Sequence, residues 1–406
     1  MDKYPLAKIP NVVFFQEGPG VRNTQYTSSG VKLLNVANLQ EGQIDLSTSE
    51  RYISNEEAYG KYKHFLVDDG DFIIASSGIK VEYFERKMGF IDQSHLPLCM
   101  NTSTIRFKAL DNDKLCLRFF MYCLKTDFFK EQLQRQITGS AQLNFGPSHL
   151  KKMSIPLPSL SEQQHIAYKL DLVCGILAKQ KRQYKLFDDL VKSKFNEMFG
   201  DPVTNPMSWE TKKLDSLGRV GSSRRVFTTE LLDNGIPFYR GTEVAKLSLG
   251  EVVQPKYYIS ETHYEELKKA TGVPSIGDLL LPSICAKGEV WKVDTDTPFY
   301  FKDGRVLWIQ LNSSDVDSEY LCYALSRKLI SDFGELASGT TFAEMKIVLL
   351  KNIRLLVPPI EIQKRFATFM KATEKTKAKL KAEIEQTETL YKALMQKYFG
   401  DKEAAA

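Results

Sequence analysis

The chain has 406 residues and a mass of 46.3 kDa, more than one hydrophobic core usually supports, so two or three domains are expected. Hydrophobic residues make up 43% and charged residues 26%, which excludes a wholly disordered chain. The net charge of +5 permits binding to a polyanion but is too small to indicate it.

Targeting and metal-binding patterns are not visible. No basic segment leads into an apolar h-region, and no apolar run approaches the ~18 residues of a membrane span. We therefore expect a cytoplasmic protein without a membrane partner. The six cysteines lack CxxC or paired-histidine spacing, which favours reduced core thiols over a zinc site.

The first predicted domain covers residues 1–157. Short apolar runs such as "DFIIAS" and "STIRF" have strand length and are bounded by Gly, Asn and Asp. A short helix is expected near residues 117–133. This segment therefore reads as mixed α and β structure.

A long helix is predicted over residues 158–200, because no proline occurs between Pro158 and Pro202. Its apolar residues recur in steps of three and four, the spacing of a coiled-coil seam. The stripe comprises Ile166, Leu170, Val173, Leu177, Tyr184, Phe187 and Val191.

The same order then returns. Residues 201–357 again contain strand-length runs, with a short helix expected near 318–333, and residues 358–400 form a second long helix before a tail at 401–406. The second stripe comprises Phe366, Met370, Leu380, Ile384, Tyr391 and Leu394.

The two halves are copies of one plan. "LPSLSEQQHIAYKL" at 157–170 matches "VPPIEIQKRFATFM" at 357–370, and at this constant offset eleven pairs are identical between residues 157–201 and 357–401, which both end in "FGD". "GVKLLNVANL" at 30–39 also resembles "GIPFYRGTEV" at 235–244.

Neither helical stripe is complete alone. Gln180 and Lys194 interrupt the first stripe where the second has Leu380 and Leu394. We therefore predict an α+β fold of two mixed α/β domains separated by two long antiparallel helices that form a coiled coil, with an internal pseudo-two-fold repeat. The alternative is that each helix packs only on its own neighbouring domain.

No catalytic or metal-binding residue is predicted. The chain lacks a GxxxxGK[ST] phosphate loop, and its five histidines are isolated from one another. "AEMK" at 343–346 resembles part of a nuclease motif, but the other half has "LNFG" in its place. The pattern favours a binding protein over an enzyme.

The repeated "IPLPSLSEQQHIAYKL", preceded by "TGSAQLNFGPSHLKKM", resembles the specificity subunit of type I restriction-modification systems. The likeness extends over essentially the whole chain. The second copy departs from the motif at Ile362 and Lys364, where the first has Glu162 and Gln164.

The resemblance implies that 1–157 and 201–357 are target-recognition domains, each binding one half of a bipartite asymmetric site in double-stranded DNA. The helices would set the spacing and dock two methyltransferase subunits. Larger complexes would add two restriction subunits that translocate DNA. The partners, not this chain, would bind S-adenosylmethionine, so no cofactor is expected here.

Basic, amide and hydroxyl side chains in loops are the candidate DNA contacts, because they suit phosphates and base edges. The adjacent arginines of "SSRR" at 222–225 are the strongest. The candidates are Arg22, Asn23, Asn38, Lys80, Ser140, Gln142, Asn144, Arg224, Arg225, Arg240, Thr242, Lys287, Thr340, Thr341 and Lys346. The competing hypothesis is a non-catalytic coiled-coil scaffold that binds two proteins without nucleic acid.

Overall fold

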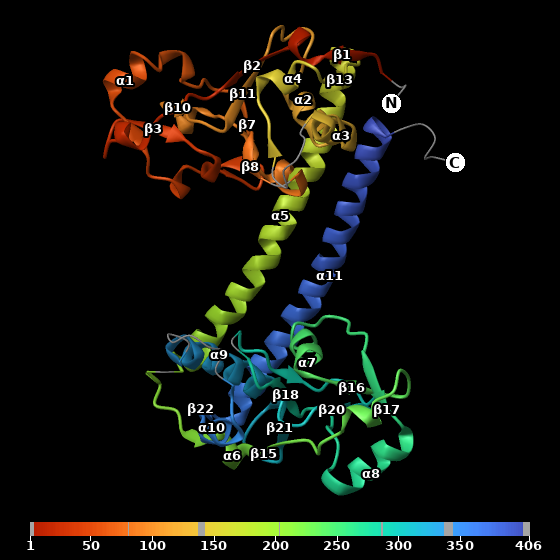
Figure 1. Cartoon of the computed structure of the whole chain (residues 1–406). Helices are drawn as coiled ribbons and strands as arrows, with labels where there is room; N and C mark the ends of the chain where they lie inside the picture. The colour runs from red at the N-terminus through yellow and green to blue at the C-terminus, as the bar shows by residue number, and fades with distance from the viewer. Residues whose placement is uncertain are drawn as a thin grey trace. The chain divides into compact units, whose positions relative to one another are not determined.

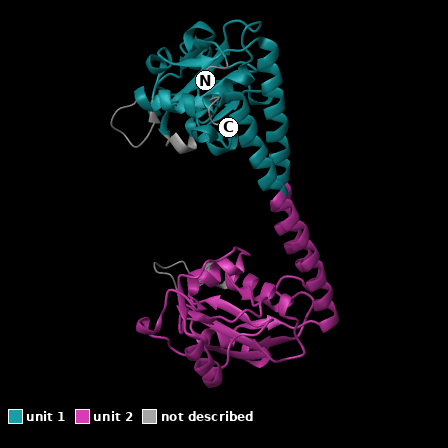
Figure 2. Cartoon of the chain, turned by 90° about the vertical axis from the view of Figure 1, so that its right-hand side faces the viewer, with its two compact units in different colours: residues 1–180, 383–406 teal, residues 181–382 magenta. Residues whose placement is uncertain are grey.

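The computed structural model describes residues 4–79, 81–136, 143–202, 204–285, 287–336 and 344–400. The chain forms two compact units, residues 1–180 with 383–406 and residues 181–382 (Figure 2). Each unit combines a mixed α/β domain with part of the two long helices, α5 (Leu160–Phe199) and α11 (Ile360–Phe399) (Figure 1). The mixture of helix and sheet expected from the sequence is present.

The first unit is built on a four-stranded antiparallel sheet in the order β2-β11-β7-β9. A three-stranded sheet, β10-β3-β6, contains the parallel pair β10–β3, while β1–β13, β12–β8 and β4–β5 form two-stranded sheets. The strands are β1 (Leu6–Lys8), β2 (Val13–Glu17), β3 (Val31–Leu34), β4 (Leu39–Gln40), β5 (Gln43–Ile44), β6 (Tyr52–Ile53), β7 (Phe72–Ala75), β8 (Ser77–Ile79), β9 (Met88–Phe90), β10 (Leu98–Met100), β11 (Thr104–Ala109), β12 (Leu143–Asn144) and β13 (Ser154–Pro156).

The helices of this unit are short apart from α5 and α11. The α-helices are α1 (Asn55–Tyr59), α2 (Leu117–Leu124), α3 (Asp127–Gln136) and α4 (Pro147–Leu150). The 3₁₀ turns are η1 (Ile9–Asn11), η2 (Asn23–Gln25), η3 (Val36–Asn38), η4 (Leu46–Thr48), η5 (Lys63–Phe65), η6 (Val81–Arg86) and η7 (Gln93–His95).

The single helix expected near 117–133 is broken between α2 and α3. The Thr126 hydroxyl donates to the Cys123 carbonyl at 2.7 Å and accepts from the Phe129 amide at 3.3 Å. This side chain therefore caps α3 and competes with the helical backbone bonds. The prediction was right about helical character and wrong about continuity.

The second unit repeats the strand order. Its four-stranded sheet runs β15-β21-β18-β19, its three-stranded sheet β17-β16-β20 has one parallel pair, and β14 pairs with β22. The elements are β14 (Thr211–Lys213), α6 (Leu214–Leu217), β15 (Gly218–Ser222), η8 (Thr228–Glu230), β16 (Ile236–Tyr239), α7 (Gly241–Ser248), β17 (Tyr257–Ile259), α8 (Glu261–Thr271), β18 (Leu279–Pro282), β19 (Trp291–Lys292), β20 (Tyr300–Phe301), β21 (Val306–Leu311), α9 (Ser318–Leu336), α10 (Ile347–Asn352) and β22 (Arg354–Leu356).

A buried carboxylate occupies the same place before the third sheet strand in both units. Asp71 accepts from Arg106 at 3.4 Å, whereas Asp278 accepts from the Trp308 indole at 2.9 Å. Burial raises the pKa of both carboxyls above the usual value. The equivalent carboxylate therefore forms an ion pair in the first unit and accepts a hydrogen bond from a neutral donor in the second.

Each unit also contains contacts between α5 and α11. In the first, Cys174 of α5 and Tyr391 and Phe399 of α11 join the core around Phe119. In the second, Phe195 and Phe199 of α5 pack on Phe366, Tyr320 and Ala324. Within each unit, residues early in one helix meet residues late in the other, so the segments run antiparallel.

Within the described ranges, no helix has the length and apolar character needed to cross a membrane.

Candidate nucleic-acid interface

In the second unit, several candidate side chains follow strand ends at one edge of the four-stranded sheet. The register Ser222–Leu307–Leu281 brings the carboxyl ends of β15 and β18 beside the amino end of β21. Arg224 follows the first of these strands, and Lys287 follows the second. The Met345 amide donates to the Ser283 carbonyl at 2.6 Å, which brings Lys346 to this edge. The fold thus gathers three sequence segments that carry cationic side chains.

The first unit gathers the corresponding segments. Glu17 of β2 and Ala75 of β7 lie at the edge where β11 begins. Arg22 and Asn23 follow β2, and both are exposed. The Phe145 amide donates to the Ser76 carbonyl at 3.0 Å, which places the backbone of Asn144 next to this edge.

The exposed cations at these edges differ in whether they already form an ion pair within the protein. The Arg225 guanidinium pairs with Asp303 at 3.2 Å, whereas Arg224 uses its backbone amide to bond the Tyr300 hydroxyl at 3.0 Å. For the described part of the chain, no ion pair is recorded for the side chains of Arg224, Lys287 or Lys346. These cations are free to neutralise a phosphate.

Arg240 and Thr242 are committed to a local network at the start of α7. Both side chains donate to the Glu243 carboxylate, at 2.9 Å and 2.8 Å, and Arg240 also lies 4.9 Å from the Tyr257 ring centroid. Burial of Glu243 works to raise its pKa, but the hydrogen bonds from Arg240 and Thr242 outweigh it, and the pKa is lowered. To contact DNA, the side chains of Arg240 and Thr242 would have to break their hydrogen bonds to the Glu243 carboxylate.

The side chain of Asn38 stabilises its own loop in this structure. Its side chain is fully buried, accepts from the Asn35 amide at 2.9 Å, and donates to Asp45 and Thr48. The sequence placed it in a polar loop, but the side chain holds that loop closed. It cannot reach a base without unfolding the loop.

Five candidates, Lys80, Ser140, Gln142, Thr340 and Thr341, lie outside the described residues, and the side chain of Asn144 does too. Their predicted role in DNA contact is unchanged.

The predicted seam residues face inward. All thirteen are buried or half-buried, including Ile166, Leu170 and Phe366 at 0% exposure. In the second unit Lys377 of α11 pairs with Asp188 of α5 at 2.5 Å. Burial works to lower the pKa of Lys377, but the hydrogen bond and charge of Asp188 prevail and raise it.

The repeated helix start contains an anchor that the sequence reading did not recognise. Gln163 is 0% exposed; its amide donates to the carbonyls of Lys114 and Pro158 at 2.9 Å and accepts from the Cys116 amide at 2.9 Å. Gln363 makes the matching three bonds, to Asp315, Pro358 and Asp317. A glutamine repeated at offset 200 on the apolar side of a helix was the available signal.

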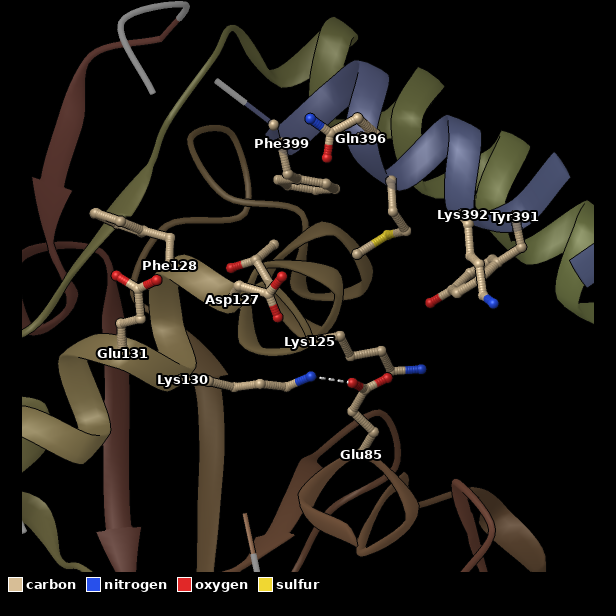
Figure 3. Close-up of a pocket in the computed structure, with 13 residues that line it drawn as sticks. Glu85, Lys125, Asp127, Phe128, Lys130, Glu131, Tyr391, Lys392, Gln396 and Phe399 are labelled. Atoms are coloured by element: carbon tan, nitrogen blue, oxygen red, sulfur yellow. Dashed lines mark hydrogen bonds and ion pairs between the residues drawn. The ribbon is translucent and has the colours of Figure 1, made fainter. Parts of the chain in front are cut away.

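A cavity of about 730 Å³ lies between α3 and the last turns of α11 in the first unit (Figure 3). Its wall mixes Lys125, Lys130 and Lys392 with acidic and aromatic side chains, and Lys130 pairs with Glu85. Burial lowers the pKa of Lys125. Among the candidates that the structure describes, no predicted DNA contact lines this cavity.

The described residues contain no group of three or more His, Cys, Asp or Glu side chains arranged to hold a metal ion.

Comparison with known proteins gives a consistent family. The model of the type I restriction modification DNA specificity domain matches residues 23–185 and again 206–386. A Haemophilus influenzae protein named as a type I restriction enzyme specificity subunit is 26% identical over 241 residues, which cover 58% of this chain and 59% of that protein. The type I restriction enzyme MjaIX specificity subunit of Methanocaldococcus jannaschii is 25% identical over 299 residues, 69% of this chain and 67% of that one.

The fold agrees with these matches. The crystal structure of a type I restriction-modification S subunit from M. genitalium superposes with a TM-score of 0.60 at 14% identity, covering 98% of this chain and 96% of the other. The two family-model matches together span most of the sequence, one in each half. The chain therefore belongs to the type I restriction modification DNA specificity family.

Proposed function

We propose that this chain is the DNA sequence-specificity subunit of a type I restriction-modification complex, and that each mixed domain binds one half of a bipartite asymmetric site. The observation that carries this proposal is the combination of one strand order with two different sets of exposed edge residues. Equal frames with unequal loops suit a site whose halves differ in sequence.

The two long helices would act as a coiled-coil spacer with pseudo-two-fold symmetry. Forty helical residues extend about 60 Å. This length is sufficient to separate two recognition domains that bind half-sites one turn of B-DNA apart, ~34–36 Å between centres. The inward-facing seam and the antiparallel contacts within each unit support this proposal.

Docking of two methyltransferase subunits is the second proposed role of the helices. Tyr168, Leu172 and Ile176 lie one turn apart on α5 and are 67%, 53% and 43% exposed. An exposed apolar stripe on a helix is typical of a protein interface. The methyltransferase partners would bind S-adenosylmethionine and methylate adenine, this chain would be non-catalytic, and restriction subunits would join larger complexes.

The scaffold hypothesis is less favoured, because a scaffold without nucleic acid has no need for unpaired cations gathered at equivalent sheet edges. Arg224 and Lys287 are exposed at such an edge.

Substituting Arg224 tests DNA binding. In complex with the methyltransferase, Arg224→Ala is expected to weaken duplex binding and to reduce the slope of log K against log salt by about 0.9, one phosphate contact. Fluorescence anisotropy across a salt series measures both quantities.

Arg225→Ala is expected to have a smaller effect, because Asp303 already holds that guanidinium. An unchanged slope and affinity in the double variant would contradict phosphate binding at this edge.

A further inference from the structure

The same turn follows the first strand of each four-stranded sheet. Arg22 precedes η2 with φ −84° and ψ 154°, and Phe227 precedes η8 with φ −81° and ψ 155°. The Arg22 amide donates to the Gln25 side chain at 3.1 Å, and the Phe227 amide donates to the Glu230 side chain at 2.7 Å. The two turns therefore share backbone conformation and closing hydrogen bond.

The surrounding frame is also shared. Val21 and Val226, one residue before each tip, are buried at 5% and 8% exposure. Gly30 and Gly235, where the chain returns, have φ of +127° and +124°, and a Cβ added there would meet a carbonyl oxygen at 2.1 Å and 2.5 Å. The buried valines and the close backbone approach at the two glycines indicate that the tips occupy equivalent positions within their units.

The two tips present different side chains. Arg22 is an exposed cation, whereas Phe227 is an aromatic side chain left 59% exposed. Exposed Arg224 and Arg225 lie just before Phe227 along the chain. A conserved backbone turn with a different side chain at its tip allows two recognition domains to contact different bases from equivalent positions.

We propose that Arg22 and Phe227 are equivalent specificity-determining residues, one in each domain. Arg22 would hydrogen-bond to a base edge, and Phe227 would make an apolar contact with a base. This inference rests on the proposed function and deepens it.

The chemistry of the two side chains sets what each can recognise. A guanidinium can donate two parallel hydrogen bonds to guanine O6 and N7. A phenyl ring offers no hydrogen bond and discriminates through contact with the thymine methyl group. The two half-sites would therefore differ in the base pair under the tip.

The test is the adenine-methylation motif of the complex in cells, determined by single-molecule sequencing. Phe227→Ala is expected to reduce discrimination about 10-fold at one position or two adjacent positions of one half-site, leaving the other half unchanged. Arg22→Ala is expected to do the same in the opposite half. Phe227→Arg is expected to shift the preference at the affected position toward guanine.

Leu249→Ala is the matched control, because it removes a 69% exposed apolar side chain from the same unit. It should leave the motif unchanged, and thermal melting should show that all variants fold as the parent does. A parent motif retained in every position by Arg22→Ala and Phe227→Ala overturns the inference alone. A parent complex that methylates no bipartite motif overturns the proposed function and the inference with it.

Discussion

At the scale of single residues, a buried amide explains why the helix start is repeated. Gln163 and Gln363 each bond one backbone amide and two carbonyls, and the carbonyl of Pro158 or Pro358 among them is buried and depends on this bond. The bonds join the start of a long helix to the loop before α2 or α9. The direction in which each helix leaves its domain is thereby fixed.

Replacing the amide should be costly. Gln163→Leu removes the partner of three backbone groups, of which the Pro158 carbonyl is buried, and we expect the free energy of unfolding to fall by about 2–4 kcal/mol, measured by urea denaturation. Gln164→Leu, at the exposed neighbouring position, should change it by less than about 0.5 kcal/mol. Equal effects of the two substitutions would contradict the anchoring role.

At the scale of elements, α5 carries two apolar faces with different fates. The inward face is buried or half-buried, with Ile166 and Leu170 at 0% exposure, whereas Leu172 and Ile176 are exposed. Exposed apolar area on a long helix contributes favourable free energy only when another surface covers it and removes it from water. The sequence reading recognised the first face and did not mark the second.

The outer face yields a prediction about assembly. Leu172→Glu combined with Ile176→Glu should weaken association with the methyltransferase at least 10-fold, because two charges would be buried in the interface. Analytical ultracentrifugation of the mixture measures it. Ala178→Glu is the control, because Ala178 is exposed and lies about a third of a turn around the helix from Leu172. Assembly of the double variant at the parent affinity would contradict docking at this face.

At the scale of the whole molecule, the two domains have one strand order but separate hydrophobic cores. Side chains in one core do not depend on packing in the other. Each domain should therefore recognise its half-site independently.

Exchanging residues 1–157 for the corresponding segment of another family member should change one half of the methylated motif and leave the other half intact. Sequencing of methylated adenines reports both halves at once. A change in both halves would show that the domains do not read independently.

The amino-acid sequence alone determined the repeat, the two long helices and their inward stripes, because helical periodicity and a constant offset are properties of the chain itself. It also placed cationic loops after the strands. Only tertiary structure decided which of these loops meet, because strand register brings β15, β18 and β21 to one edge. The folded conformation likewise decided that Asn38 is buried and bonded to Asn35, Asp45 and Thr48, and that Arg240 pairs with Glu243, because the sequence does not show how a loop closes on itself even when the partners are near in the chain. It also showed that Arg22 and Phe227 occupy equivalent turns of the two domains, because a shared backbone conformation is not visible in their residue types.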